Sequence, residues 1–271
     1  MKLSFSTVGC PEWMLNEVLA AASDFGYDGV EIRGLGEDIF LPKAPCFGPK
    51  RLATSLKEIE TAHVEISCLS SDASCLLASH SLDVPSNIKA YIDLAVMIGA
   101  KNIRILADEW GPPAPNVDRE LVRENLKTVV PYAEEKGIML LVETCGVYGD
   151  TKILRDLVES VASPAVGVLW DMHHPYRYHA EQPEETLKNV GEYIRHVHIK
   201  DSVVKPGGIV EYRMLGYGDI PLRDMIFQLA DIGYEGHLSL EWMKRWNEEL
   251  EAPGIVFSHY VRKMRRWLAE L

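Results

Sequence analysis

Short apolar runs rich in β-branched residues alternate with longer stretches of helical periodicity from one end of the chain to the other. This alternation is typical of parallel strands joined by crossover helices. Eight strand-like runs can be counted, and glycine or proline usually lies close to each. They span residues 3–8, 29–33, 64–69, 102–106, 138–143, 166–171, 196–200 and 237–241.

The stretches between these runs predict helices on the outside of a sheet. Apolar residues recur at helical spacing over residues 13–26, 87–100, 121–137 and 222–233, and each stretch closes on or beside a glycine. Pro131 lies inside the third stretch, where proline is expected to tilt or restart a helix.

Eight β–α units without a polar linker, a low-complexity tract or a charge block predict a single (β/α)8 TIM barrel domain over residues 1–271. The alternative is an open doubly wound sheet. A dinucleotide site in such a sheet would need GxGxxG after the first strand, whereas that strand runs into VGCPEW. In a barrel, we expect the active site at the C-terminal ends of the strands.

Composition limits the classes of partner. A net charge of −12 and a pI near 5.2 repel phosphate backbones and anionic lipid surfaces, so neither nucleic acid nor a membrane is an expected partner. The five cysteines are scattered and lack CxxC spacing, which argues against a disulfide framework and favours small buried side chains. The N-terminus lacks the pattern of a signal peptide, and we expect a cytoplasmic protein. A homo-oligomer is left open.

Four metal-ligand residue types stand at the ends of four successive strand-like runs. They are Glu143, Asp171, His198 and Glu241. Singly, such a residue more often caps a helix or lies on the surface. Neighbouring strands of a barrel bring them to one arc of the mouth, where unpaired carboxylates would repel one another without a cation. The set therefore predicts one divalent metal ion, which could be Mn, Mg, Co or Zn.

Basic residues near the same strand ends are candidates for substrate binding. Arg104 and Lys200 end their runs, and each either contacts an anionic or hydroxyl-rich group or forms a structural ion pair. Arg213, which precedes a glycine-containing loop, is a third candidate. Glu31 and Arg33 share one face of the second strand, and we interpret them as an ion pair or polar layer, with substrate binding as an alternative.

Loops beside the predicted mouth give weaker signals. Trp13, Trp110 and Trp242 fall near strand-to-helix loops, where they either wall a pocket or pack in the core. The LGYGD loop over residues 215–219 is too brief for a phosphate cradle, and we expect a turn with Asp219 capping the following helix.

The chain resembles the xylose-isomerase-like barrel enzymes, which include sugar epimerases, inosose-processing enzymes, hydroxypyruvate isomerase and endonuclease IV. The motifs that carry the resemblance are GYDGVEIR (26–33), LVET (141–144), WDMHH (170–174), HVHIKD (196–201), LGYGDIPL (215–222) and GYEGHLSLEW (233–242).

This resemblance implies that the four strand-end residues are the metal ligands. It also implies that Glu143 and Glu241 act as the catalytic acid/base pair and that His174, from a D-x-x-H pattern, orients the substrate. For the adjacent His173, a structural role is an equal alternative to substrate binding.

We therefore expect a metal-dependent isomerase or epimerase of a small sugar, keto-sugar or related polyol. The metal would acidify a C–H beside a ketone and stabilise a cis-enediolate, with one carboxylate removing the proton and the other returning it. The alternatives are an inosose- or dehydroshikimate-type dehydratase, a non-catalytic sugar-binding barrel and, least favoured, an endonuclease-IV-like nuclease. That nuclease would need further histidines at earlier strand ends, where the sequence has CLSSD and ILADE.

Overall fold

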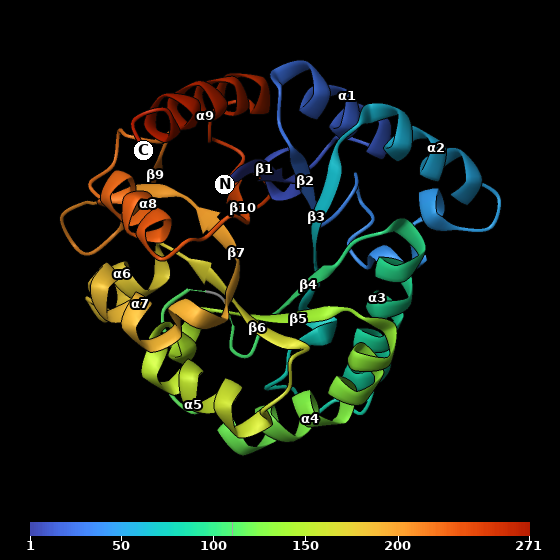
Figure 1. The fold of residues 1–271 in the computed structure, drawn as a ribbon, viewed down its shortest axis with the longest axis horizontal. Helices are drawn as coiled ribbons and strands as arrows, with labels where there is room; N and C mark the ends of the chain where they lie inside the picture. The colour runs from blue at the N-terminus through green and yellow to red at the C-terminus, as the bar shows by residue number, and fades with distance from the viewer. Residues whose placement is uncertain (110) are drawn as a thin grey trace.

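Eight parallel strands close into one barrel in the computed structural model, which describes residues 1–109 and 111–271 (Figure 1). Around the barrel the order is β1-β10-β7-β6-β5-β4-β3-β2, so strands that follow one another in this ring are hydrogen-bonded neighbours. The predicted single (β/α)8 barrel is confirmed. The barrel strands are β1 (Lys2–Ser6), β2 (Gly29–Ile32), β3 (Glu65–Ser70), β4 (Asn102–Ile105), β5 (Met139–Glu143), β6 (Val166–Asp171), β7 (Ile194–Ile199) and β10 (His237–Leu240).

Helices surround the barrel as an outer ring (Figure 1). In the described part of the chain, none of them is long and apolar enough to cross a membrane. The α-helices are α1 (Leu15–Phe25), α2 (Leu52–Ala62), α3 (Val84–Ile98), α4 (Arg119–Lys136), α5 (Thr151–Val161), α6 (His174–His179), α7 (Pro183–Val190), α8 (Leu222–Asp231) and α9 (Pro253–Leu268). The 3-10 helices are η1 (Thr7–Gly9), η2 (Leu41–Lys43), η3 (Pro45–Phe47), η4 (Ala73–Cys75), η5 (Gly146–Gly149) and η6 (Gly191–Tyr193).

Helix α4 runs through Pro131 without the expected restart. Val129, Val130 and Ala133 on either side of the proline are buried in the core. Their burial against the barrel stabilises the helix where the proline removes a backbone hydrogen bond.

The two faces of the strands bury different chemistry. Outward-facing side chains such as Phe5, which stacks on Phe257 of α9 with ring centroids 4.2 Å apart, form the apolar core between barrel and helices. The barrel interior instead holds buried polar side chains, among them Glu31, His196 and His198. A barrel lined in this way fixes titratable groups in a water-poor interior near its C-terminal mouth.

A two-stranded antiparallel hairpin follows β7, and the sequence pattern above does not predict it. It consists of β8 (Asp201–Val204) and β9 (Val210–Arg213). The turn between them contains Gly207 and Gly208, both with positive φ. The signal was the KPGG segment between two Val-containing runs, which is a common hairpin pattern.

The carboxylate of Asp201 organises the LGYGD loop against the start of this hairpin. One oxygen accepts the backbone amides of Gly216 and Gly218 at 2.8 and 2.9 Å, and the other accepts the amide of Ser202. A Cβ on Gly218 would clash with this carboxylate, and Gly216 has a φ of +81°, so both positions require glycine. The predicted cap was wrong, because Asp219 pairs with Arg177 and no side chain caps α8.

The three tryptophans near the loops have separate outcomes. Trp242 is buried and donates its indole N–H to the carbonyl of Glu251 at 3.0 Å. Trp13 is partly buried and packs edge-to-face on Phe257. Trp110 lies outside the described residues. Four of the five free cysteines are buried, as expected, and Cys46 is partly exposed.

We predict that Asp201→Ala lowers the free energy of unfolding by about 2 kcal/mol, because three backbone amides lose their acceptor. Urea denaturation followed by circular dichroism measures this loss. Asp231→Ala, which removes an exposed carboxylate in α8, is the matched control and should change stability by less than about 0.5 kcal/mol. Equal effects of the two substitutions would contradict the role given to Asp201.

Candidate active site and metal centre

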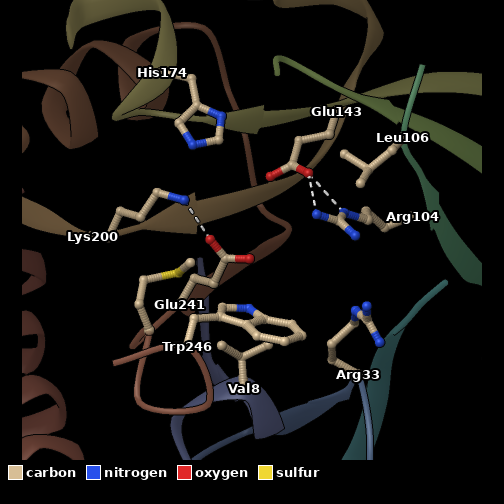
Figure 2. Close-up of a pocket in the computed structure, with 10 residues that line it drawn as sticks. Val8, Arg33, Arg104, Leu106, Glu143, His174, Lys200, Glu241 and Trp246 are labelled. Atoms are coloured by element: carbon tan, nitrogen blue, oxygen red, sulfur yellow. Dashed lines mark hydrogen bonds and ion pairs between the residues drawn. The ribbon is translucent and has the colours of Figure 1, made fainter. Parts of the chain in front are cut away.

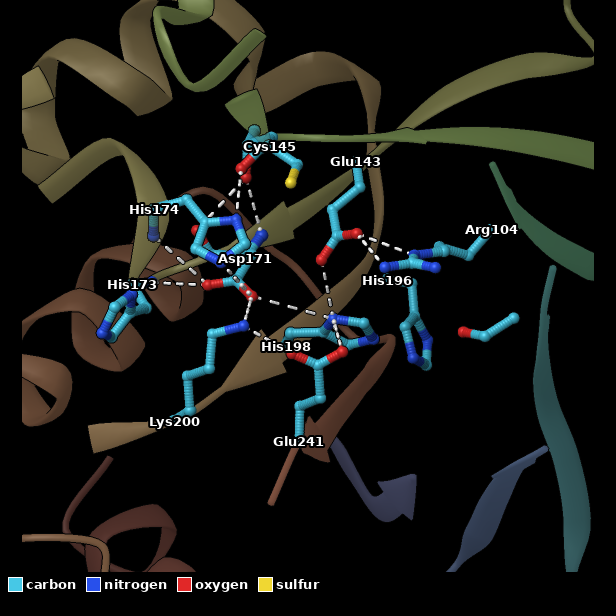
Figure 3. A network of polar contacts seen from close by, with 12 residues as sticks. Arg104, Glu143, Cys145, Asp171, His173, His174, His196, His198, Lys200 and Glu241 are labelled. Atoms are coloured by element: carbon cyan, nitrogen blue, oxygen red, sulfur yellow. Dashed lines mark hydrogen bonds and ion pairs between the residues drawn. The ribbon is translucent and has the colours of Figure 1, made fainter. Parts of the chain in front are cut away.

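The four predicted ligand residues lie together at the C-terminal mouth of the barrel (Figure 3). Glu143 and Asp171 end β5 and β6, His198 lies near the end of β7, and Glu241 directly follows β10. One ligand atom from each lies within 4.8 Å of the others, and all four side chains are buried. Because these strands are neighbours in the barrel, their order alone brings the four groups to one arc.

Nδ1 of His198 is at the centre of this arrangement. It lies 3.1 Å from Oε1 of Glu143, 3.5 Å from Oε1 of Glu241 and 3.9 Å from Oδ2 of Asp171. A hydrogen bond from the amide of Glu241 to the carbonyl of Ile199 extends the pairing of β10 with β7 and fixes the position of this carboxylate. The imidazole therefore faces all three carboxylates with the same nitrogen.

Glu31 on β2 holds the opposite nitrogen of the same imidazole. Its carboxylate lies 2.9 Å from Nε2 of His198 and 2.8 Å from Nε2 of His196, and it also accepts the hydroxyl of Ser70. Burial alone would raise the pKa of Glu31, but the two histidines outweigh burial and hold that pKa well below its usual range. An ionised Glu31 orients His198 with an N–H on Nε2 and leaves Nδ1 toward the mouth.

Two cations support the outer carboxylates. Nε of Arg104 donates to Oε2 of Glu143 at 2.7 Å, and Nη2 lies 2.6 Å from the same oxygen. Nζ of Lys200 lies 2.5 Å from Oε2 of Glu241 and 2.6 Å from Oδ2 of Asp171. Both residues reach the predicted mouth. Each also forms an ion pair with a candidate ligand, as the alternative prediction of a structural ion pair had it.

The surrounding basic groups keep Glu143 and Asp171 ionised. Burial would raise the pKa of Glu143, yet Arg104 and His198 bring that pKa well below its usual value. The pKa of Asp171 is also lowered, since His174 and Lys200 outweigh the effect of its burial. Burial would lower the pKa of Lys200, but Asp171 and Glu241 raise it well above the usual range.

The donor set fits a divalent cation. Three carboxylates and one imidazole nitrogen converge, and such oxygen-rich sets suit Mn²⁺, Mg²⁺, Co²⁺ or Zn²⁺. Oδ2 of Asp171 is buried and has no hydrogen-bond partner within the described residues, because Lys200 is close but poorly aligned for donation. A buried carboxylate oxygen without a hydrogen bond is a suitable ligand atom.

The two adjacent histidines after β6 point in different directions. Oδ1 of Asp171 accepts the backbone amides of His173 and His174, and this turn starts α6. His174 lines the cavity, and its Nδ1 lies 3.2 Å from the carbonyl of Thr144. His173 instead bonds the hydroxyl of Ser202 at 3.0 Å. Of the two histidines, His174 is therefore the one that faces the cavity.

A small cavity of about 30 Å³ lies beside the candidate ligands Glu143 and Glu241 (Figure 2). Its wall contains residues of two kinds, those of the ligand cluster and those from loops after other strands. The lining residues are Val8, Arg33, Arg104, Leu106, Glu143, His174, Lys200, Glu241, Met243 and Trp246. Arg213 is not among them, because it lies on β9 of the hairpin and pairs with Glu211.

Several residues that line the cavity were not predicted from the sequence. Val8, Leu106, Met243 and Trp246 form an apolar wall, and no residue-type signal distinguishes them from core residues. Their only shared signal is that each follows the end of a strand by a few residues. Of the two arrangements expected for Glu31 and Arg33, the ion pair is not formed among the described residues, because Glu31 pairs with the two histidines of β7.

Comparison with known proteins places this chain in a wider group. Residues 19–262 match the family model described as "Xylose isomerase-like TIM barrel". The chain is similar to the fructoselysine 3-epimerase of Shigella flexneri, with 28% identity over 285 aligned residues that cover 100% of this chain and 99% of that one.

Solved structures share the fold at low sequence identity. One is the IOLI protein with a binding zinc atom, at 18% identity and a TM-score of 0.80, covering 100% of this chain and 99% of that one. Another is the 3-keto-D-glucoside 4-epimerase YcjR from E. coli, at 16% identity and a TM-score of 0.77, covering 98% and 99%.

We predict that Glu31→Gln weakens Mn²⁺ binding by about 10- to 100-fold, because the neutral amide no longer holds the Nε2–H of His198 as firmly. Isothermal titration calorimetry with MnCl2 measures the change. Glu65→Gln is the matched control, since Glu65 also pairs with a histidine, His237, outside the candidate centre. An unchanged affinity in the Glu31 variant would show that His198 is oriented without this carboxylate.

Proposed function

The chain belongs to the xylose isomerase-like TIM barrel family, and from this premise we propose that it is a divalent-metal-dependent isomerase or epimerase. Its substrate would be a small sugar, keto-sugar or related polyol. The observation that carries the proposal is the convergence of Glu143, Asp171, His198 and Glu241 within 4.8 Å beside a cavity. The full-length similarity to a protein named fructoselysine 3-epimerase supports epimerisation of a ketose.

These four side chains would hold the metal ion. When bound, a divalent cation supplies Lewis-acid polarisation of substrate oxygens and stabilises the negative charge that develops as a neighbouring C–H loses its proton. Asp171 and His198 would serve as ligands only. Glu143 and Glu241 would have a second role, because they stand at the two ends of the arc.

Glu143 and Glu241 are suited to proton transfer in complementary ways. Each fixes one oxygen on a cation, Arg104 or Lys200, and turns the other toward His198. One carboxylate would remove the proton beside the substrate ketone, and the other would return it. Return to the same carbon gives epimerisation, and return to the neighbouring carbon gives isomerisation.

His174 would orient the substrate as a neutral imidazole. Burial lowers its pKa, and its Nδ1–H donates to the carbonyl of Thr144. Nε2 is thereby left as an acceptor beside the cavity. A substrate hydroxyl donating to Nε2 would be held beside the two glutamates, with its C–H directed at one of them.

We predict that Glu143→Gln and Glu241→Gln each slow solvent-deuterium exchange into a bound ketose by at least about 100-fold, because each removes one proton-transfer group. Mass spectrometry of ketoses incubated with the Mn²⁺-loaded protein in D2O measures the exchange. Glu65→Gln, a glutamate outside the cavity, is the control and should keep the wild-type rate.

The products separate the related reactions. Exchange with a new sugar stereoisomer supports epimerisation, and exchange with an aldose product supports isomerisation. Loss of water after exchange would instead indicate a dehydratase. Retained exchange in both glutamine variants would refute the two-carboxylate scheme, and a wild-type protein that binds ketose without exchange would be a binding protein.

His174→Asn should lower kcat/KM by about tenfold through a higher KM, since one hydrogen bond to the substrate is lost. Mn²⁺ affinity should stay within about threefold, because His174 is outside the proposed ligand set. His173→Asn is the matched control, because His173 bonds Ser202 away from the cavity. If kcat/KM fell tenfold in His173→Asn and did not fall in His174→Asn, His173 would be the histidine that orients the substrate.

A further inference from the structure

Among the charged side chains that line the cavity in the described part of the chain, the guanidinium of Arg33 has no ion-pair partner. It directly follows β2 and is 9% exposed, and its guanidinium points into the cavity (Figure 2). Its Nη1 is buried without a hydrogen-bond partner, and no ion pair within 4.0 Å joins its side chain to any described residue. A buried unpaired guanidinium is costly for a folded protein unless a ligand compensates it.

The other cations of the cavity are already paired. Arg104 binds Glu143 and donates to the carbonyl of Ser71, and Lys200 bridges Asp171 and Glu241. The carboxylates of Glu143, Asp171 and Glu241 are therefore already paired with these two cations. Among the cavity cations of the described residues, only Arg33 lacks such a partner.

The surroundings of Arg33 favour an anion. Burial lowers the pKa of Arg33, and the positive charge of Arg104 lowers it further. Arg245 adds to the positive field, while Asp72, an acidic side chain that acts on Arg33 in the opposite sense, is engaged with the amide and hydroxyl of Ser74. An anion between these arginines would be attracted by all of them.

We propose that Arg33 forms an anion-binding subsite, and that the physiological substrate is a keto-sugar or keto-polyol bearing a carboxylate or a phosphate monoester. The guanidinium offers a planar pair of N–H donors that matches either group in bidentate fashion. This inference deepens the proposed function and rests on it for the identity of the reacting part of the substrate.

The position of Arg33 indicates which part of the substrate carries the anion. In Figure 2, Arg33 lies across the cavity from Lys200 and His174, with Trp246 and Val8 along the wall beside it. The anionic group would therefore be at the end of the substrate remote from the hydroxyl that His174 holds. It would contribute to binding without taking part in proton transfer.

The test compares ligands that differ only at one terminal carbon. D-fructose, D-fructuronate and D-fructose 6-phosphate are titrated into the Mn²⁺-loaded protein by calorimetry, together with the corresponding three forms of D-tagatose. We expect one anionic form to bind at least tenfold more tightly than the neutral ketose, which corresponds to about 1.4 kcal/mol. Comparison of the carboxylate and phosphate arms identifies which anion the subsite takes.

Arg33→Gln should reduce the ratio of anionic to neutral ketose affinity, both measured in the same Mn²⁺-saturated variant, to within twofold. Arg33→Lys should retain part of the preference, since it keeps the charge and loses the planar pair of donors. Arg213→Gln is the matched control, because it removes the same charge from the hairpin outside the cavity and should keep the full preference.

A wild-type protein without an anionic preference, or an Arg33→Gln variant that keeps it, would overturn the subsite. Solvent-deuterium exchange distinguishes this failure from failure of the proposed function. An Arg33-dependent preference without deuterium uptake supports the subsite and refutes the isomerase or epimerase. Deuterium uptake into ketoses without a preference for the anionic forms supports the isomerase or epimerase and refutes the subsite.

Discussion

The crowding of four carboxylates into one buried barrel mouth is the constraint on which the other features of the site depend. Glu31, Glu143, Asp171 and Glu241 are all buried there. Two like charges 4 Å apart repel by about 4 kcal/mol at the effective dielectric constant of protein sites. A few such repulsions would match the whole stability of a typical domain. The nearby Arg104, Lys200 and imidazoles follow from this constraint, as does the proposed cation.

The sequence was sufficient for the barrel and for its four candidate ligands. Strand ends are visible as local patterns, and the barrel rule makes consecutive strands neighbours, so Glu143, Asp171, His198 and Glu241 could be brought together without knowing any side-chain conformation. Boundaries differed by a residue or two, as in β7, which begins at Ile194 instead of residue 196. The helix through Pro131 differed because buried packing, which local propensity does not include, stabilises it.

Contacts between side chains of elements that are not neighbours in the barrel could not be predicted in the same way. Glu31 meets His196 and His198 across the barrel interior, and β2 and β7 are not neighbours in the sheet. The different orientations of His173 and His174 depend on which partner each ring finds. Arg213 looked suitable by residue type, but the unpredicted hairpin carries it away from the cavity.

The cavity wall is divided between two halves of the barrel. The candidate ligands come from β5, β6, β7 and the end of β10, while Val8, Arg33 and Leu106 follow β1, β2 and β4. Substitutions in the first half of the chain can therefore alter which molecule fits, while the proposed ligands in the second half stay in place. Such a division allows one ancestral reaction to diversify over many substrates by drift in a few loops, without an intermediate that has lost its chemistry.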